Sequence, residues 1–189
     1  MSVEEYLRYD EASPLRHEYV RGEIYAMSGV TLRHNTIARN IIGRLLPAAG
    51  NGPCQVFFSD VRLGVADDVY YYPDVMVACG ALNDLDVIVR DPCVVVEVTS
   101  PTTARVDRSE KLLAYRGIAS LRAYLIVDHR RRRVERHWRE LTSSWVHDEV
   151  VGEGSVPVPC LDVELPLDEI YRGVELPTVA EPDPVDYEA

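Results

Sequence analysis

The chain has 189 residues, of which 47% are hydrophobic and 27% charged, a balance that predicts one soluble globular domain with its own core. The formal net charge of −11 argues against a protein that binds nucleic acid indiscriminately. No apolar run approaches the roughly 18 residues of a membrane span, and the acidic N-terminus lacks the features of a signal peptide, so we expect a cytoplasmic protein with no membrane partner.

The first quarter of the chain predicts a short helix, a hairpin and a longer helix. Residues 2–14 predict a peripheral helix and turn, and residues 17–28 predict a β-hairpin around an Arg-Gly turn. In residues 31–46 isoleucines and leucines recur at helical spacing, which predicts an amphipathic helix. His34 lies near the start of this helix, where a histidine is either a hydrogen-bonded or surface residue or part of a site.

Two strands are predicted next, residues 55–65 and 69–79, joined by a polar turn. A polar insertion, residues 80–91, follows them. Asp74 comes directly after a proline and before an apolar run, so we expect it where the second strand approaches the functional edge of a sheet.

The central stretch combines a buried strand with a charged helix. Residues 93–96 are rich in β-branched side chains, and the run is only long enough for a strand. The run ends on Glu97, and a carboxylate on a strand covered on both faces has to be paired, metal-bound or protonated. Asp107, with a glutamate three residues later, resembles a capping box and predicts the start of a helix that carries Lys111. The acid and the amine can therefore converge on one point.

Lys111 is the only lysine among 20 basic residues. A lysine can lose its proton when its surroundings demand it, whereas an arginine cannot. The composition leaves two interpretations open: a lysine that chemistry requires, or a leftover surface residue.

The last third predicts strands, a short helix and a tail. The strands and helix are expected at residues 121–128, 134–139, 144–151, 156–165 and 167–171, with the second and third strands forming a hairpin. The end of the chain is acidic and contains three prolines, which predicts disorder. The predicted organisation is therefore one domain, residues 1–174, and a disordered tail, residues 175–189.

The four cysteines are scattered and form no CxxC pair. Their mostly apolar, strand-like surroundings favour buried free thiols over disulfides or zinc ligands. They are Cys54, Cys79, Cys93 and Cys160.

Asp74, Glu97 and Lys111 together form a candidate site. Two oxygen ligands on adjacent strands suit Mg²⁺ or Mn²⁺, which can activate a water and stabilise the charge that develops on a phosphate. A nearby amine can orient or deprotonate that water, or neutralise the phosphorane. This is the chemistry of phosphodiester hydrolysis. The alternatives are that Asp74 caps a turn and that Glu97 pairs with an arginine across the sheet.

Five motifs occur in a characteristic order: HEYVRGEI at 17–24, RHN at 33–35, YPDV at 72–75, VEVTSPTT at 96–103, and DRSEK at 107–111 with YR at 115–116. From about residue 17 to residue 171 the chain resembles the Uma-two family of restriction-endonuclease-like proteins, within the PD-(D/E)xK nuclease superfamily.

This resemblance implies an α/β fold: a restriction-endonuclease-like core with a mixed central sheet flanked by helices, an N-terminal β-hairpin and a C-terminal β-hairpin extension. It implies that Asp74 and Glu97 are catalytic metal ligands and that Glu18 completes the metal site. The superfamily lysine is expected two residues after the acid, where this chain has Thr99. The family pattern points instead to Lys111 as the relocated catalytic lysine.

The expected function is a Mg²⁺- or Mn²⁺-dependent nuclease that hydrolyses DNA phosphodiester bonds and works as a homodimer. The hairpin of residues 134–151, with Trp138 and Trp145, is the candidate surface for self-association. The alternative is a non-catalytic DNA-associated or protein-binding module that keeps the nuclease fold. The acidic net charge favours the module, whereas the acid pair and the single lysine favour the enzyme. Glu23 is a weaker candidate for the metal site than Glu18.

Overall fold

The computed structural model describes residues 1–99, 103–140 and 143–177. In these ranges no helix has both the length and the apolar character needed to cross a membrane. From residue 178 onward the tail predicted to be disordered lies outside the described residues, as do Ser100 and Pro101 after the central strand. The division into one domain and a tail stays a prediction.

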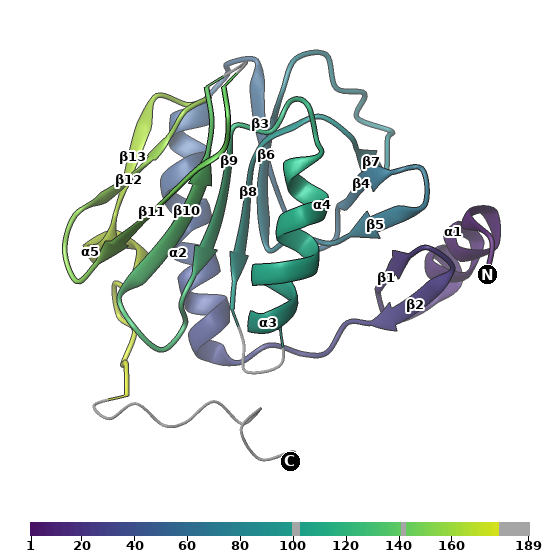
Figure 1. The fold of residues 1–189 in the computed structure, drawn as a ribbon, viewed down its shortest axis with the longest axis horizontal. Helices are drawn as coiled ribbons and strands as arrows, with labels where there is room; N and C mark the ends of the chain where they lie inside the picture. Colours follow the sequence, from purple (N-terminus) through teal and green to yellow (C-terminus); the bar gives the residue numbers. More distant parts are fainter. Residues whose placement is uncertain (100–102, 141–142, 178–189) are drawn as a thin grey trace.

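A six-stranded mixed sheet forms the centre of the described part of the chain (Figure 1). Its strands, in spatial order, are β11 (Val146–Val151), β10 (Arg133–Trp138), β9 (Ala123–Val127), β8 (Pro92–Val98), β6 (Val75–Cys79) and β3 (Cys54–Phe58). The strands β8 and β9 are parallel, and the other neighbours are antiparallel.

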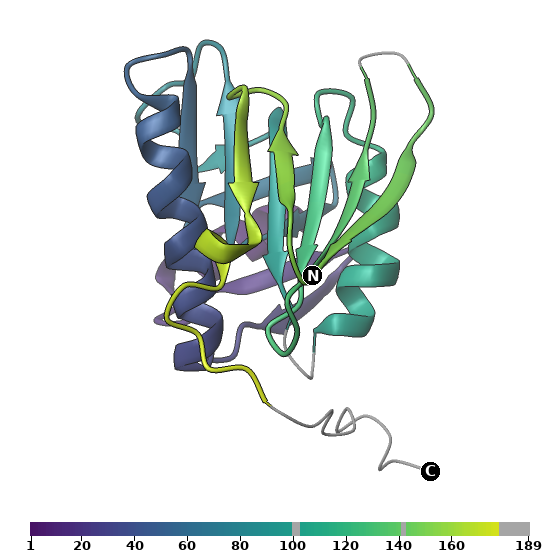
Figure 2. The same cartoon turned by 90° about the vertical axis from the view of Figure 1, so that its left-hand side faces the viewer.

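The central strand β8 is buried along its whole length because helices cover both faces of the sheet. The alternation of a strand sends Val94 and Val96 into one core with α2 (Leu32–Ala49), and Val95 into another with Tyr115. Figure 2 shows α2 and the helix that contains Tyr115 on opposite sides of the sheet. The apolar run predicted a buried strand, and the structure confirms it.

The N-terminal elements belong to a smaller sheet beside the central one. Its strands, in spatial order, are β2 (Glu23–Ala26), β1 (His17–Val20), β5 (Val69–Tyr71), β4 (Arg62–Ala66) and β7 (Ile88–Val89), and α1 (Val3–Ala12) packs against it. The hairpin turn places Arg21 and Gly22 at φ angles of 49° and 103°. Two consecutive positive φ values are typical of the tight turns that match strand twist. The predicted first helix and hairpin are confirmed.

The prediction of two long strands, residues 55–65 and 69–79, is wrong, because each is two strands in different sheets. The chain leaves β3 and enters β4 through Ser59, which has a φ of 52°, outside the strand region. It leaves β5 and enters β6 at Pro73, which has no amide proton for a ladder. Asp74 therefore lies where the chain crosses between the two sheets.

The C-terminal elements extend the central sheet and cover α2. The hairpin β10–β11 forms one edge of the sheet, as the predicted C-terminal extension requires. Residues 156–165, predicted as one extended segment, instead form a second hairpin of β12 (Ser155–Val158) and β13 (Val163–Pro166). This hairpin and α5 (Leu167–Ile170) share a hydrophobic core with α2.

The prediction of free cysteine thiols is also wrong, because the four side chains form two disulfides, Cys54–Cys79 and Cys93–Cys160. Cys54 and Cys79 face each other in the β3–β6 ladder, with Cα atoms 3.9 Å apart. The Cα atoms of Cys93 and Cys160 are 6.3 Å apart, within the range that a disulfide spans. The pairs are 25 and 67 residues apart in sequence, so no local spacing reveals them.

A buried charge network fixes α1 against the smaller sheet. Asp10 is fully buried and accepts hydrogen bonds from Arg62 Nη2 at 2.7 Å and from the His17 amide at 2.7 Å. It also accepts a short hydrogen bond from the hydroxyl of Tyr72. Since Tyr72 is two residues before Asp74, the network also holds the segment that crosses between the sheets.

We expect Asp10→Ala to lower the free energy of unfolding by about 3–5 kcal/mol, because it leaves the Arg62 guanidinium buried without its carboxylate. Urea denaturation at neutral pH measures the change. The matched control is Glu11→Ala, at an exposed position of the same helix, where we expect a change within about 0.5 kcal/mol. Equal stability of the two variants would contradict a structural role for the network.

Candidate functional site

A cleft of about 620 Å³ opens between the N-terminal hairpin, the start of α2, the end of β8 and the helix that follows it. Its acidic, basic and histidine lining residues are Glu18, His34, Asp74, Glu97, Asp107, Glu110, Lys111 and His129. The cleft thus brings together Asp74, Glu97, Lys111, Glu18 and His34, which the sequence singled out. It does not include Glu23, which lies exposed at the start of β2.

The strand register places Asp74 and Glu97 at the same end of the sheet. The strands β6 and β8 are antiparallel, with Val75 paired to Val96, so Asp74 and Glu97 each lie one residue beyond this pair. The carboxylate of Asp74 reaches across to β8, where Oδ2 accepts a hydrogen bond from the Val98 amide at 2.7 Å. The side chain of Asp74 therefore bonds to the neighbouring strand.

Lys111 lies inside a group of carboxylates. Its Nζ atom is 2.8 Å from Glu18 Oε1, 3.1 Å from Glu97 Oε1 and 3.7 Å from Asp107 Oδ1. Only 5% of Lys111 is exposed, so the interpretation as a leftover surface lysine is wrong. Glu97 forms its ion pair with Lys111, and the alternative of an arginine across the sheet is also wrong.

Asp107 belongs to this group, although the sequence predicted a capping residue. The helix begins three residues earlier, as α3 (Ala104–Val106), continues through the π-helical turn η1 (Asp107–Lys111), and ends as α4 (Leu112–Arg116). The predicted capping box is therefore wrong. Asp107 is 1% exposed. It lies on the same side of the helix as Lys111, which comes four residues later in the chain. Its Oδ1 atom has no hydrogen bond to any described residue.

Burial and repulsion by neighbouring acids raise the pKa values of Glu97 and Asp107. Burial raises the pKa of Glu97 well above its ordinary range, against the attraction of Lys111. Burial likewise raises the pKa of Asp107 to about 6. Burial alone would lower the pKa of Lys111, but Glu97, Glu18 and Asp107 outweigh it and raise that pKa well above its ordinary value. The amine is therefore a stable cation in a cleft with excess negative charge.

Two more side chains hold the predicted acids in place. His34 Nε2 is 2.9 Å from Asp74 Oδ1, and the Tyr115 hydroxyl donates a hydrogen bond to Glu97 Oε1 at 2.8 Å. The sequence reasoning missed Tyr115 and Asp107 as site residues. Both lie four residues from Lys111, so the helical spacing around the single lysine could have identified them.

The donor chemistry of the cleft fits a hard divalent cation, because its acids provide only oxygen ligands and outnumber its one ammonium. The Asp107 oxygen without a hydrogen bond is a further available donor. In the described residues, however, no three of these acids have ligand atoms that all lie within 4.8 Å of one another. The ammonium of Lys111 lies within ion-pair distance of both Glu18 and Glu97. The three predicted ligands, Asp74, Glu97 and Glu18, therefore do not surround one common point.

The tyrosines before Asp74 are packing residues. Tyr70, Tyr71 and Tyr72 are each at most 2% exposed. They therefore pack in the core rather than forming a surface on which bases could stack.

Comparisons with known proteins place the chain in a family. The model of the Uma2 family, described as "Putative restriction endonuclease", matches residues 3–168. Two uncharacterised proteins of Synechocystis sp. are similar over most of their length. The protein sll1609 is 33% identical over 160 residues, which cover 82% of this chain and 90% of that protein. The protein slr1290 is 28% identical over 176 residues, which cover 92% and 93% respectively.

A solved structure shares the fold. The crystal structure of a "putative nuclease belonging to DUF820" from Anabaena variabilis matches with a TM-score of 0.72 and covers 90% of this chain and 97% of its own. Its sequence identity is 16%, a level at which the likeness shows the fold alone. The match confirms the predicted restriction-endonuclease-like α/β fold class.

The raised pKa of Asp107 predicts a pH-dependent loss of stability in the metal-free protein. A carboxyl group whose pKa rises from 3.8 to about 6 on folding stabilises the fold when protonated. That contribution is lost as the pH rises from about 4 to about 6. Asp107→Asn mimics the protonated form, so its stability advantage over the wild type should grow across this window, by up to about 3 kcal/mol.

Urea denaturation at several pH values between 4 and 7, with a chelator present, measures this difference. Subtracting wild type from variant cancels the contributions of the carboxylates that do not interact with Asp107. The exposed Asp84→Asn is the matched control. A constant difference between Asp107→Asn and wild type across the window would contradict the burial of a charged Asp107.

Proposed function

Since the chain belongs to the Uma2 family, we propose that it is a metal-dependent nuclease that hydrolyses phosphodiester bonds in DNA. The membership confirms the resemblance that the sequence motifs indicated. One observation carries the proposal: the Lys111 ammonium lies buried among Glu18, Glu97 and Asp107, in a cleft that also contains Asp74. An ordinary structural ion pair does not need this excess of acids.

We propose that Asp74, Glu97 and Glu18 hold Mg²⁺ or Mn²⁺. When bound, the ion would supply an activated water and stabilise the charge on the phosphate. Val98 and His34 orient the Asp74 carboxylate through their contacts with its two oxygens. Such supporting contacts keep ligand side chains in their binding orientation.

Lys111 supplies positive charge in this scheme. Its raised pKa disfavours a neutral amine while no metal is bound, so the protonated form is the one that meets the substrate. A protonated amine can orient the attacking water and neutralise the phosphorane. The Tyr115 hydroxyl shares Glu97 Oε1 with Lys111 and keeps that carboxylate turned towards the amine.

The second candidate is a non-catalytic module that binds DNA or a protein with the same fold. The net charge of −11 and the acidic cleft favour its protein-binding form, because both repel a phosphate backbone. Cleavage assays decide between the two. They would cover single-stranded, duplex and branched DNA, and RNA, each with Mg²⁺ and with Mn²⁺. Metal binding without cleavage of any substrate would favour the module.

Self-association stays a prediction. The strand β11 is an edge of the central sheet, with Val146 and Val151 exposed on it, which is compatible with pairing to a second copy. Trp138 and Trp145 are partly buried against the protein's own cores. The cytoplasmic location also stays a prediction.

Metal binding should stabilise the protein measurably. At a hundredfold excess of Mg²⁺ or Mn²⁺ over the dissociation constant, we expect a gain of about 2.7 kcal/mol in the free energy of unfolding. Asp74→Asn should abolish the gain, although the asparagine oxygen can still accept from the Val98 amide. Thermal melts across a metal titration measure it.

The matched control for metal binding is Glu23→Gln, which removes an acid of the same hairpin as Glu18 but outside the cleft. This variant should keep the full gain. A wild-type melting temperature that does not change across the titration would argue against the metal site.

Substitution of Lys111 tests the role of the amine. We expect Lys111→Ala to lower the cleavage rate by about a hundred- to a thousandfold, the usual loss for a group that stabilises developing charge. Lys111→Arg should fail almost as badly. The Nζ atom is enclosed by three carboxylates, with the Tyr71 ring centre 5.3 Å away, and the wider guanidinium does not fit this space.

Single-turnover cleavage of the substrate found above measures both Lys111 variants, with folding checked by thermal melts. Arg105→Ala, at an exposed position of the same helix, is the control and should cleave like the wild type. Near-wild-type activity of Lys111→Arg would show that positive charge alone is needed. Wild-type activity of Lys111→Ala would exclude the amine from catalysis.

A further inference from the structure

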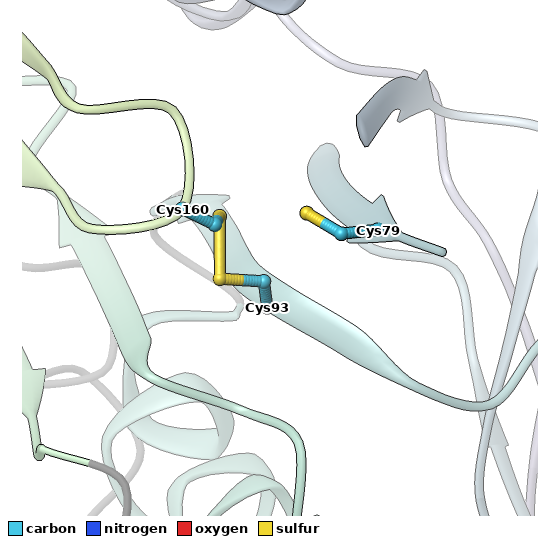
Figure 3. A group of neighbouring side chains, drawn as sticks. All are labelled: Cys79, Cys93 and Cys160. Carbon is cyan, nitrogen blue, oxygen red and sulfur yellow. A yellow bond between two sulfur atoms is a disulfide. The ribbon is translucent and has the colours of Figure 1, made fainter. Parts of the chain in front are cut away.

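A second cluster of chemically reactive side chains lies at the other end of the central sheet. Asp74 precedes β6 and Glu97 lies near the end of β8. Cys79 ends β6 and Cys93 lies near the start of β8, so these two lie at the opposite ends of the same strands. Figure 3 shows the Cys79 sulfur turned towards the Cys93–Cys160 pair. The Sγ atoms of the three residues all lie within 4.8 Å of one another.

Cys54 completes the cluster. Its sulfur is bonded to that of Cys79 and lies 3.6 Å from the carbonyl oxygen of Cys160. The four sulfurs come from β3, β6, β8 and the turn between β12 and β13. Three of these elements are neighbouring strands of one sheet, so the backbone fixes where their cysteines meet.

We propose that the reduced protein binds one zinc ion through the thiolates of these four cysteines. A tetrahedral site with Zn–S bonds of about 2.3 Å places its sulfurs about 3.8 Å apart. In the disulfide-bonded form, three of the four sulfurs already lie within 4.8 Å of one another, and Cys54 is joined to one of these three through its bond to Cys79. Four thiolates select a soft or borderline ion such as Zn²⁺ over the hard cations that suit the acidic cleft. This proposal is independent of the proposed nuclease activity.

The two disulfides and the zinc site are the oxidised and the reduced state of one cluster. Each disulfide takes up two electrons and two protons from a dithiol reductant, which itself becomes a disulfide. The four thiols that result lose four protons as they bind the metal. Both states tie the β12–β13 turn, which carries Cys160, to the central sheet. Zinc would keep this tie in a reducing compartment, where disulfides rarely persist.

One other group in the described residues has ligand atoms within 4.8 Å of one another: Glu135, His137 and His147. It is a poorer cation site, because Glu135 Oε1 is 2.7 Å from Arg108 Nε, and His137 Nδ1 is 3.1 Å from an Arg116 nitrogen. A metal there would have to displace two guanidinium groups. This group therefore provides the control.

Cobalt is the probe for the test. The full chain is reduced, stripped with a chelator and titrated with Co²⁺ without oxygen. We expect a thiolate-to-cobalt charge-transfer band and tetrahedral d–d bands that saturate at one thiolate-bound Co²⁺ per chain and disappear when Zn²⁺ is added. Cys160→Ser should weaken binding by more than about a hundredfold, since the loss of a group that only hydrogen-bonds to a metal ligand already costs about ten- to a hundredfold.

His147→Ala and Asp74→Asn should leave the charge-transfer band unchanged, because neither residue belongs to the cysteine cluster. The absence of the band from the reduced wild type, or a Co²⁺ affinity and band intensity in Cys160→Ser equal to those of the wild type, would overturn the proposal.

Alkylation of the wild-type protein gives a second readout that does not depend on any variant folding. Zn²⁺ should slow the modification of all four thiols by iodoacetamide, and mass spectrometry measures the extent of modification. If the reduced protein unfolds without metal, Zn²⁺ should restore its far-UV circular dichroism. Equal alkylation with and without Zn²⁺, or a reduced chain that zinc does not refold, would contradict the proposed site.

Discussion

The buried ammonium of Lys111 is the interaction on which the cleft depends. It joins Glu18 on β1, Glu97 on β8 and Asp107 on its own helix, and so connects the smaller sheet, the central sheet and the helix that covers it. Without this charge, three acids would face one another in a space largely shielded from water, where an uncompensated charge costs several kcal/mol. The same acids keep the amine protonated. The ion pairs therefore stabilise the site, while its acids still outnumber its one ammonium.

Much of the architecture and part of the site could be predicted because the relevant information is local. The β-branched run before Glu97 is compatible with little except a buried strand, and helical spacing fixes α2. A carboxylate at the end of such a strand has few physical explanations. A single lysine in an arginine-rich chain indicates a position where the two cations differ. These two arguments single out Glu97 and Lys111 as candidate site residues from the amino-acid sequence alone.

The predictions that were wrong share one cause: the features concerned depend on contacts between segments that are distant in sequence. Ser59 and Pro73 mark strand breaks, but only the pairing of the segments shows that the chain changes sheets there. The cysteines looked like separate buried thiols because the register that joins Cys54 to Cys79 is invisible in their spacing. Asp107 fitted a capping pattern, and only the packing of the helix on Glu97 reveals it as a member of the cleft.

Because η1 is a π-helical turn, the number of residues between Asp107 and Lys111 decides which side chains face the cleft, as much as their identity does. Such turns hold one residue more than the α-helical turn they replace. Deleting one residue within it would restore an α-helix and rotate Asp107 by about 100° about the helix axis. Tyr115 and the core beyond it would keep their places. An alignment gap between Asp107 and Lys111 would therefore separate relatives with a three-acid cleft around the lysine from relatives with two.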